Sequence, residues 1–476
     1  MDQTLWTSAD AAMATGGTIS EGWLASGISI DTRSLQPGDL FVALTAARDG
    51  HDFVNAAFQA GAAAALVSRP VEGGPTLVVD DVLPALEALG VAARARCNGT
   101  RTAVTGSVGK TSVKEMLARI FQAEGPAHWP EKSFNNHWGV PLTLARMPQN
   151  TQRAVFEIGM STPGEIAPRS EMVRPHCGII TKIAPVHLEG LGTIEAIAEE
   201  KADIFAGLEA GGFAILPADD RFLDRLKARA LEACPTAQCL TFGQAEGASA
   251  RVLNYHSTGY AAEADLDILG QHVRIQIQAG GIHWAINAAA AILAAVAASN
   301  VNAHRAVEAL NGFAPPEGRG QAEKLWLPNG EQAVMIDDSY NANPTSMTAA
   351  LEALSRRPAN RRLVALGEMG ELGPEADALH AGMAPAVEGS GANCAFLAGT
   401  GMSPLFEALP NTIQKHQAEK ANDLLDLIKN TLEEGDVLLI KGSNASGMGQ
   451  IAKALRDWSA SSAKENKIDV SEEEAG

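Results

Sequence analysis

The sequence predicts an α/β protein built from three domains in series, and three observations lead to this fold class. At 476 residues, the chain is longer than a single hydrophobic core usually organises. Hydrophobic residues make up 46% and charged residues 20%, as in globular proteins that bury a large core. Apolar, strand-like runs alternate with helical patterns along most of the chain, which favours parallel sheets covered by helices.

The first domain is expected at residues 1–98. GDLFVAL, at 38–44, has the apolar run of a strand, and FVNAAFQAGAAAALV, at 53–67, indicates a helix that leads into another strand. These pieces are short and closely spaced. They predict a small α/β unit.

The second domain is expected at 99–316 and the third at 317–458. In the second, AVFEIGM (154–160) and CGIITKI (177–183) are apolar strands, and AINAAAAILAAVAAS (285–299) indicates a buried helix. The Pro- and Gly-rich FAPPEGRGQ is a linker by composition. Beyond it, four apolar strands separated by helical stretches predict a doubly wound parallel sheet: AVMIDD, RRLVALG, CAFLAG and DVLLIKG. The polar, acidic tail at 459–476 is expected to be disordered.

The charge and cysteine content exclude several classes of function. The net charge of −19 argues against nonspecific binding of nucleic acid and against docking on an anionic membrane. Five scattered cysteines without a C-x-x-C pair indicate neither a disulfide framework nor a zinc site. The N-terminus lacks the pattern of a secretion signal, and the alanine-rich stretch is shorter than a membrane span. We expect a cytoplasmic monomer without membrane insertion.

The stretch TGSVGKTSVKEML, residues 105–117, predicts a phosphate-binding loop between a strand and a helix. Its pattern lacks the usual first glycine, because Val104 stands there. The free N–H groups of the helix start attract an anion, Lys110 adds a cation, and Thr111 offers a hydroxyl to a metal ion. A nucleoside triphosphate with magnesium fits this chemistry. An ordinary turn with an incidental lysine is the alternative.

Three polar residues further along the chain occupy unusual places. Glu157 interrupts an apolar strand, which is costly unless its carboxylate has a partner such as a metal ion; otherwise it faces outward from an edge strand. His187 follows a strand, where its imidazole can bind a metal or simply cap a loop. Lys201 shares a helical face with Ile197 and Ile204. Burying a charged amine there is costly, so the side chain either has a specific buried environment or extends to solvent.

Taken in order, these features resemble the central domain of the Mur ligase family of ATP-dependent, amide-forming enzymes. The resemblance rests on TGSVGKTS, FNNHWGVPLTL, Glu157, PVHLEGLG and EEKADIF. The family loop is T-G-[ST]-x-G-K-[ST], so Val104 conforms to it. ISIDTRSLQPGDLFVAL and DGHDF look like the family's segment for a uridine-diphosphate sugar. DDSYNANPTSM, LGEMGELG and DVLLIKGSNASGM look like the member that adds D-alanyl-D-alanine to UDP-N-acetylmuramoyl tripeptide.

The resemblance covers nearly the whole chain and implies a three-domain architecture, with a central ATPase-like domain of the P-loop type and a C-terminal Rossmann-like domain. It implies that ATP phosphorylates the tripeptide carboxylate, and that the dipeptide amine attacks the acyl phosphate to give a peptide bond, ADP and phosphate. The third peptide residue, diaminopimelate or lysine, stays open. The rival interpretations are a folylpolyglutamate synthase, the ligase that adds the third residue, or a noncatalytic nucleotide switch.

The resemblance also assigns roles to individual residues. Lys110, His187 and Lys201 are implied to be catalytic, and the metal ligands are Thr111, Glu157, His187 and Lys201, the last as a carbamate. The nucleotide-binding residues are Gly106, Ser107, Gly109, Lys110, Thr111, Ser112, Asn287, Arg319, Asp338 and Tyr340. The uridine-diphosphate sugar is implied to lie at Asp31, Thr32 and Arg33.

Two further points follow from comparing the segments with the family pattern. Asn287 matches the family asparagine that meets the adenine, although it can instead bond to a neighbouring loop, and Asn341 and Asn343 are expected to shape the loop before Pro344. Asn444 stands where the family usually has arginine, which leaves the dipeptide contacts open. Because short linkers join the domains, closure of the third domain onto the second is an expected step.

Overall fold

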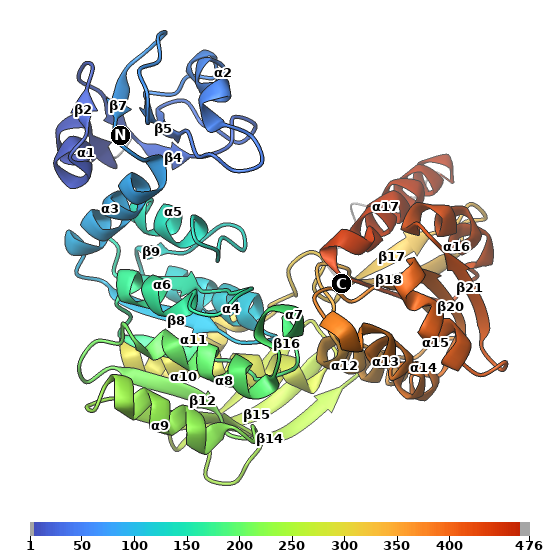
Figure 1. Cartoon of the computed structure of the whole chain (residues 1–476). Coiled ribbons are helices and arrows are strands. Elements are labelled where there is room, and N and C mark those ends of the chain that lie inside the picture. Colours follow the sequence, from blue (N-terminus) through green and yellow to red (C-terminus); the bar gives the residue numbers. More distant parts are fainter. Residues whose placement is uncertain (1–3, 467–476) are drawn as a thin grey trace.

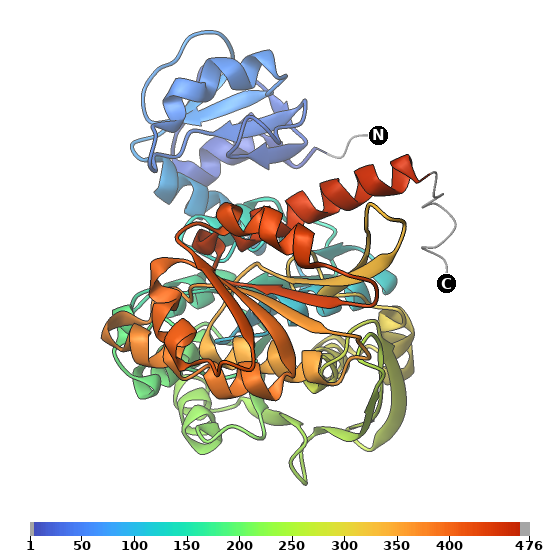
Figure 2. The same cartoon turned by 90° about the vertical axis from the view of Figure 1, so that its right-hand side faces the viewer.

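The computed structural model describes residues 4–466 as three α/β domains (Figure 1). The first domain stands above the central domain, and the third lies beside the central domain in that view. After a 90° turn, the third domain lies in front of the central one while the first domain still projects above (Figure 2). The family-like architecture expected from the sequence is therefore confirmed.

The first domain contains a five-stranded sheet in the order β2-β7-β6-β5-β4. Strands β4 to β7 are parallel and β2 is antiparallel to β7. A separate ribbon pairs β1 with β3. The strands are β1 (Trp6–Thr7), β2 (Thr18–Ile19), β3 (Leu24–Ala25), β4 (Gly27–Ser29), β5 (Asp39–Val42), β6 (Ala64–Val67) and β7 (Thr76–Val78). The helices are α1 (Ser8–Thr15), α2 (Val54–Gln59) and α3 (Val82–Ala95).

The central domain is organised by a nine-stranded sheet in the order β16-β15-β14-β13-β12-β11-β8-β10-β9. Its strands run parallel from β9 to β14, and β15 and β16 add an antiparallel extension. The strands are β8 (Thr100–Thr105), β9 (Ala127–His128), β10 (Arg153–Glu157), β11 (Cys177–Ile180), β12 (Phe213–Pro217), β13 (Gln238–Gly243), β14 (Ala250–Ser257), β15 (Ala262–Ile268) and β16 (Gln271–Ile277).

Helices cover both faces of the central sheet. One buried cluster joins the sheet to α4, α10 and α11, and a second joins it to α5, α6, α8 and α9. The helices are α4 (Lys110–Ala123), α5 (Gly139–Ala145), α6 (Ile166–Val173), α7 (Leu188–Leu191), α8 (Ile194–Ala202), α9 (Leu223–Ala233), α10 (Ile282–Ser299) and α11 (Ala303–Leu310).

Helix α10 is the alanine-rich helix expected from the sequence. Its length and apolar composition match those of a membrane-crossing helix, and it is the one helix in residues 4–466 for which this holds. Its side chains are mostly buried against the central sheet, as in the core helix of a globular domain. The close approach of α10 to the sheet follows from the small alanine side chains.

The third domain has a six-stranded sheet in the order β17-β18-β22-β19-β20-β21, with helices on both faces. The sheet is parallel except for β17, which pairs antiparallel with β18 at one edge. The strands are β17 (Gln321–Trp326), β18 (Gln332–Asp338), β19 (Arg362–Gly367), β20 (Ala392–Ala398), β21 (Gln414–Ala418) and β22 (Val437–Lys441). The helices are α12 (Pro344–Ser355), α13 (Ala376–Ala381), α14 (Ala384–Gly389), α15 (Ser403–Ala408), α16 (Leu425–Thr431) and α17 (Met448–Glu465).

The end of the chain differs from the expectation. Helix α17 continues to Glu465, so the expectation of disorder from 459 is wrong for residues 459–465. Ser459, Ser462 and Ala463 are buried, and Ser459 Oγ accepts a hydrogen bond from the Trp326 backbone at 2.8 Å. The polar composition predicted disorder, but serine and alanine side chains are small enough to be buried where a helix lies against a sheet. Residues 467–476 lie outside the described part, and the domain boundaries at 98/99 and 316/317 stay predictions.

Candidate active site

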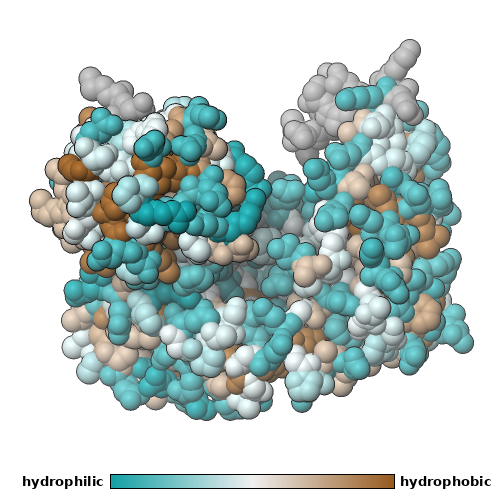
Figure 3. Space-filling model, turned by 45° about the horizontal axis from the view of Figure 1, so that its top comes forward, coloured by the Kyte–Doolittle hydropathy of each residue, from teal (hydrophilic) through white to brown (hydrophobic). Residues whose placement is uncertain are grey.

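A cavity of about 500 Å³ lies between the central and third domains. It is lined by the carboxyl ends of central strands, the start of α10, the linker around Arg319, and one side of α12. Figure 3 shows the surface hollowed between the first and third domains. Ligands of parallel α/β sheets bind at such strand ends, so this cavity is the candidate active site.

The phosphate loop depends on two glycines. Gly106 has φ +148°, and a Cβ there would lie 1.9 Å from Thr181 Oγ1. Gly109 has φ +86°, and a Cβ there would lie 2.9 Å from Asn287 Oδ1. Helix α4 begins at Lys110 directly after Gly109 and has no side-chain cap, so its first N–H groups are available to an anion.

Lys110, Ser107 and Ser112 contribute different polar groups to the phosphate-loop region. Lys110 Nζ donates to the Gly106 carbonyl at 2.7 Å, and burial lowers the pKa of this lysine while Glu157 opposes the shift. The Ser107 hydroxyl donates to Ala184 O at 2.9 Å and also accepts from the Ala184 N–H, so it ties the loop to the segment after β11. Ser107 and Ser112 are both buried and both line the cavity.

Thr111 and Glu157 form a buried polar pair beside the loop. The Thr111 hydroxyl donates to Glu157 Oε2 at 2.8 Å, and the Asn135 amide donates to Glu157 Oε1 at 2.8 Å. Glu157 is 2% exposed and ends β10, which lies between β8 and β9. An outward-facing glutamate on an edge strand is therefore excluded. Its carboxylate and the Thr111 hydroxyl are hard oxygen donors of the kind that magnesium prefers.

His187 bridges the central and third domains. Its Nδ1 contacts a carboxylate oxygen of Glu371, and the Glu189 N–H donates to Glu371 O at 3.3 Å. His187 and Glu371 both have positive φ, at 53° and 59°, a conformation that costs free energy for residues other than glycine. Two strained loops thus meet at this contact, and the ring of His187 lines the cavity.

Lys201 is buried at the end of α8. It is 1% exposed, so a side chain that extends to solvent is excluded. Burial lowers its pKa well below the usual value, and the nearby positive charge of Lys110 adds to the shift. Burial therefore favours the neutral amine of Lys201 over its ammonium form, and the neutral amine is the nucleophilic form.

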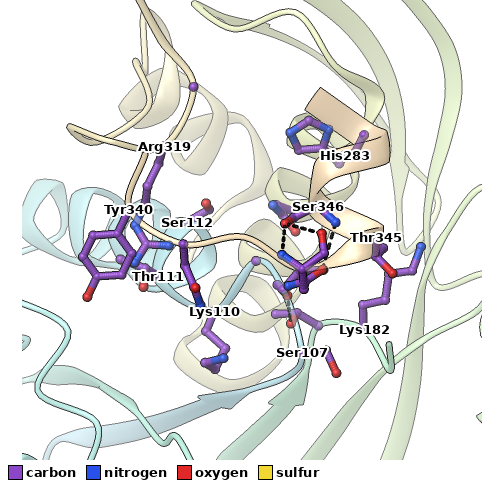
Figure 4. A pocket seen from close by; sticks show the side chains of 18 of the residues that line it. Ser107, Lys110, Thr111, Ser112, Lys182, His283, Arg319, Tyr340, Thr345 and Ser346 are labelled. Atoms are coloured by element: carbon purple, nitrogen blue, oxygen red, sulfur yellow. Dashed lines mark hydrogen bonds between the residues drawn. The ribbon is translucent and has the colours of Figure 1, made fainter. Parts of the chain in front are cut away.

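The third domain and the linker contribute cations and an aromatic ring. The Arg319 guanidinium lies 4.0 Å from the centre of the Tyr340 ring, and its Nη2 is 3.4 Å from Ser133 Oγ. In Figure 4, Arg319, Tyr340 and Thr111 lie together on one side of the cavity, whereas Lys182, Thr345 and Ser346 lie on the other. The linker arginine therefore faces the phosphate-loop residues, as a phosphate-binding group must.

Asp338 is held by a residue that the sequence reasoning did not assign. Lys441 Nζ donates to Asp338 Oδ2 at 2.7 Å and to Asn341 O at 3.0 Å. Burial raises the pKa of Asp338, and the ion pair with Lys441 opposes that shift. Asp338 and Lys441 are paired across the parallel strands β18 and β22. Aligning the ends of β18 and β22 in the sequence would have placed Lys441 next to Asp338.

Two further cavity residues come from α10. Asn287 is buried and lines the cavity next to Gly109. His283, one turn earlier, also lines it, and burial lowers the pKa of His283 to about 4, so its ring is neutral at neutral pH. The spacing of four residues places both side chains on one face of the helix. This spacing from Asn287 would have predicted from the sequence that His283 lines the site.

The first-domain segment lies apart from this cavity. Asp31, Thr32 and Arg33 follow β4, and none of the three lines the cavity. Arg33 donates to Asp31 from Nε at 2.9 Å and from Nη2 at 2.6 Å, and this lowers the pKa of Asp31 to about 2. Asn444, the departure from the family pattern, is exposed at the start of a short 3₁₀ turn and does not line the cavity either.

Metal binding by acidic and imidazole groups alone is not indicated. Across residues 4–466, no three or more His, Cys, Asp and Glu side chains are arranged to hold a metal ion. Asn135, which the sequence reasoning also missed, instead completes the hydrogen bonding of Glu157. A magnesium ion here would need oxygens from its phosphate ligand, as is usual for this cation.

The sequence matches family models along most of its length. The Mur ligase family catalytic domain matches residues 25–123, the Mur ligase middle domain 104–295, and the Mur ligase glutamate ligase domain 326–444. A phosphate loop, a buried carboxylate and an interdomain cavity agree with a nucleotide-dependent ligase. The chain belongs to the Mur ligase family, whose members are ATP-dependent ligases.

Its relatives identify the branch of the family that it resembles. The UDP-N-acetylmuramoyl-tripeptide–D-alanyl-D-alanine ligase of Escherichia coli is 35% identical, with 90% of this chain and 93% of that protein covered. The enzyme of the same name from Rickettsia prowazekii is 30% identical, with 94% and 99% covered. A crystal structure of MurF from Acinetobacter baumannii superposes with a TM-score of 0.83 at 28% identity, covering 95% of this chain and 99% of that one. MurF ligase from Thermotoga maritima in complex with ADP shares the fold, with a TM-score of 0.77, 22% identity, and coverage of 91% and 98%.

Proposed function

We propose that this chain uses ATP to join D-alanyl-D-alanine to UDP-N-acetylmuramoyl tripeptide, giving the pentapeptide precursor of peptidoglycan. One observation carries the proposal: relatives named for this reaction match at least 90% of the chain, and the match includes the phosphate loop and the third-domain residues that line one cavity. The rival ligases are disfavoured because relatives at 30% and 35% identity carry the name of this reaction, whereas a ligase that adds diaminopimelate superposes over 96% of the chain with a TM-score of only 0.51 at 18% identity. A noncatalytic switch is disfavoured by the buried lysine next to the loop.

The chemistry requires a carboxylate to approach a triphosphate, so the site must neutralise negative charge. The tripeptide carboxylate attacks the γ-phosphorus of ATP, which gives an acyl phosphate and releases ADP. The dipeptide amine then attacks the acyl carbon, loses a proton and expels phosphate, which leaves an amide. Lys110, the free N–H groups of α4 and Arg319 supply positive charge around the phosphates.

Magnesium fits the oxygens of Thr111 and Glu157. Glu157 is buried, and its hydrogen bonds within residues 4–466 come from the neutral side chains of Thr111 and Asn135, so its negative charge suits a bound cation. His187 lines the same cavity, and its imidazole would help to hold a second ion near the carboxylate. Bound magnesium would neutralise phosphate oxygens and hold the reactants in line.

Lys201 supports a carbamate role because it is a buried amine with a lowered pKa. Its neutral nitrogen attacks the carbon of CO₂, an N–C bond forms, and the nitrogen loses a proton to water. The product is an anion, which suits a place beside a cation better than an ammonium does. Lys201 does not itself line the cavity, but the charge of Lys110 acts on it, which supports a carbamate near the phosphate end of the site.

The uridine-diphosphate sugar is assigned to the first domain, around Asp31, Thr32 and Arg33. These residues lie beyond the cavity, so a substrate bound there must extend toward the phosphate loop with its peptide end. Lys132 lies in the loop that carries Ser133 and Asn135, and its charge acts on Asp31. This effect supports a substrate that extends along that loop from the first domain to the cavity. We further infer that the protein is cytoplasmic and monomeric. Light scattering of the purified protein tests the oligomeric state.

The first experiment measures phosphate release with ATP, magnesium, D-alanyl-D-alanine and UDP-N-acetylmuramoyl tripeptide, omitting each in turn. Tripeptides ending in diaminopimelate and in lysine are tested separately, because the chain does not specify which is used. Release that needs every component supports the ligase. Release that continues without the dipeptide rejects it in favour of a nucleotide switch or another ligase.

A second experiment tests the carbamate with Lys201→Ala, assayed with and without a short carboxylic acid. We expect turnover to fall by about a hundredfold or more and to recover partly with the acid, which replaces the lost anion. Lys453→Ala, at an exposed lysine of α17, is the matched control and should retain full activity. Full activity in Lys201→Ala rejects the carbamate role without affecting the ligase assignment.

A third experiment separates metal binding from turnover. Mn²⁺ replaces magnesium as a paramagnetic probe, and its binding in the presence of ADP is followed by electron paramagnetic resonance. Glu157→Gln keeps the hydrogen-bonding shape but removes the charge, so we expect weaker Mn²⁺ binding by about tenfold or more. Unchanged binding would remove Glu157 from the metal site.

A further inference from the structure

Arg357 is a buried cation in the cavity wall that the proposed reaction does not use. It follows α12, is 3% exposed, and lines the same cavity as the phosphate loop. Its Nε and Nη1 are fully buried and have no hydrogen-bond partner within the described residues. Leaving guanidinium donors unpaired in a folded interior costs free energy, so this arrangement needs a partner from outside the chain.

The neighbours of Arg357 do not neutralise its charge. The guanidinium lies 4.7 Å from the centre of the Tyr260 ring, which comes from the turn between β14 and β15. Among the described residues, the groups that act electrostatically on it are Tyr260 and Tyr255, and no carboxylate pairs with it. Tyr255 Oη is itself buried without a partner. The ring contact holds the side chain in place and satisfies none of its N–H groups.

The part of the cavity wall formed by α12 carries small side chains between Ser346 and Arg357. Ser346, Ala349, Ala350, Ala353 and Arg357 all line the cavity from α12 and the turn after it. The spacing of the first four puts them on one side of the helix, whose rise from Ser346 to its end at Ser355 is roughly 14 Å, and Arg357 follows that end. Phe242 and Trp284 line the cavity from the central domain. The cavity thus runs from a phosphate-binding end to an apolar end with a charged donor.

A nucleotide has the same distribution of chemistry. Its phosphates are anionic, whereas its base is a flat ring with acceptor nitrogens on its edge. With the phosphates at the α4 start, a base in the apolar section would place an edge acceptor near the unpaired N–H groups. Small alanine side chains on α12 leave the width that a flat ring needs.

We propose that Arg357 binds the base of the nucleotide, donating a hydrogen bond from Nε or Nη1 to an acceptor nitrogen on the edge of the purine. The proposal rests on the proposed function, because it takes the phosphates to lie at the phosphate loop. It assigns a specificity-determining contact to a residue distant from the reacting atoms. The base is selected by this donor, and the chemistry is carried out at the other end of the cavity.

The test compares ATP with its 1-deaza, 3-deaza and 7-deaza analogues, each of which replaces one acceptor nitrogen by C–H. KM and kcat are measured for the wild type and for Arg357→Met, which keeps the length of the side chain but has no donor. We expect the wild type to lose about tenfold in KM with one analogue, as for a hydrogen bond to a charged donor. Arg357→Met should show a similar KM increase with ATP itself, an unchanged kcat, and no further loss with that analogue.

Matched variants separate base recognition from a structural role. Arg356→Met alters the exposed neighbouring arginine and should behave like the wild type. Arg357→Lys retains a donor and should recover part of the KM, and it also serves if Arg357→Met does not fold. An Arg357 variant with the wild-type deaza profile would overturn the proposal and make the arginine a domain contact. A wild type that binds no adenine nucleotide would overturn the proposed function itself.

Discussion

The first domain joins the central domain through a shared hydrophobic cluster, whereas the third domain touches it through separate polar contacts. Trp6, Leu89 and Ala93 pack with Leu142 and Ala145 of α5 in one buried cluster. The buried clusters of the third domain draw only on residues from 325 onward, as far as the structure describes the chain. Apolar area buried across a junction resists separation, while isolated polar contacts exchange readily with water.

Directed hydrogen bonds reinforce the first junction. Trp6 Nε1 donates to Ala145 O at 2.9 Å, and Arg146 Nε donates to Ile28 O at 2.7 Å. The Arg96 guanidinium lies 3.9 Å from the centre of the Trp6 ring. At the other junction, Glu371 contacts His187 and Glu189, and Arg319 Nη2 lies 3.4 Å from Ser133 Oγ. The Tyr260 ring also lies against the Arg357 guanidinium, and its Oη is 3.5 Å from Pro358 O.

The difference indicates which domain moves during turnover. A fixed first domain keeps the sugar-nucleotide segment at a constant distance from the phosphate loop. A third domain held by few contacts can open to admit nucleotide and dipeptide, then close to complete the cavity. The four predictions below test this contrast through the free energy of unfolding, from the largest expected effect to the smallest.

Removing the central side chain of the first junction should have the largest effect. Trp6 is 2% exposed, and Trp6→Ala removes its packing, its hydrogen bond and its contact with Arg96. We expect a loss of about 3–5 kcal/mol in a urea titration followed by circular dichroism. The control is Leu24→Ala, at a residue that is 63% exposed, which should change stability by less than about 0.5 kcal/mol. A loss below about 1 kcal/mol for Trp6→Ala would contradict a tight junction.

Forcing α3 and α5 apart should have the next largest effect. A Cβ at Gly90 would lie 3.1 Å from Pro141 O and 3.1 Å from Leu144 Cβ, so the two helices meet at this glycine. Gly90→Leu should destabilise the protein by about 1–3 kcal/mol in the same titration. Gly389→Leu, at a helical glycine with open space around it, is the control. Equal stability of the two variants would show that the helices separate at little cost.

Acid should weaken the part of the molecule next to the first junction. Burial lowers the pKa of His128 to about 4 from its usual 6.5, and its Nε2 is 2.7 Å from Thr143 O of α5. Between pH 6.5 and 4 the unfolded chain binds this proton and the folded chain does not, so stability is lost as the pH falls through that window. We expect about 1–2 kcal/mol less stability at pH 5 than at pH 8 from this group.

The His128 contribution is isolated by comparing His128→Asn with the wild type at both pH values. The variant should show a smaller loss of stability between pH 8 and pH 5. His304→Asn, at an exposed histidine of α11, provides the control. An identical pH dependence in His128→Asn and the wild type would assign the acid sensitivity to other groups.

The smallest effect on stability should come from the second junction. The Glu371 side chain is about half exposed, so Glu371→Gln should change the free energy of unfolding by less than about 0.5 kcal/mol. We expect kcat to fall by about tenfold nevertheless, because closure onto His187 is weakened. Small-angle scattering with bound nucleotide should show a larger radius of gyration than in the wild type. Glu375→Gln, in the same loop, should leave kcat and radius unchanged.

The periodic parts of the fold followed from the sequence because their signals are local. Apolar runs predicted β5, β10, β11 and β22, and the alanine-rich stretch predicted α10. The last turns of α17 did not follow, since Ser459 and Ser462 are polar by composition and are buried only because a sheet lies beneath them. The antiparallel edge strand β17 also carried no distinguishing signal.

The part of the candidate site that could be predicted is the motif whose residue spacing specifies its backbone conformation. The glycine loop identified Gly106 and Gly109, whose backbone conformations the structure requires. Lys441, Asn135 and Arg357 were missed because their importance depends on pairing between distant segments. Asp31, Thr32 and Arg33 are close to one another in sequence, yet their distance from the cavity depends on the placement of a whole domain. The roles of these residues stay predictions.

The shared cluster at the first junction also sets an order of events during synthesis. Leu142 and Ala145 complete the core around Trp6, so the first 98 residues cannot finish folding when they leave the ribosome. Until α5 emerges, the nascent N-terminal segment exposes the apolar surface that Leu142 and Ala145 later cover, and such exposed surface favours aggregation. The third domain carries all of its own core, so it can fold unaided once its last helix has been translated.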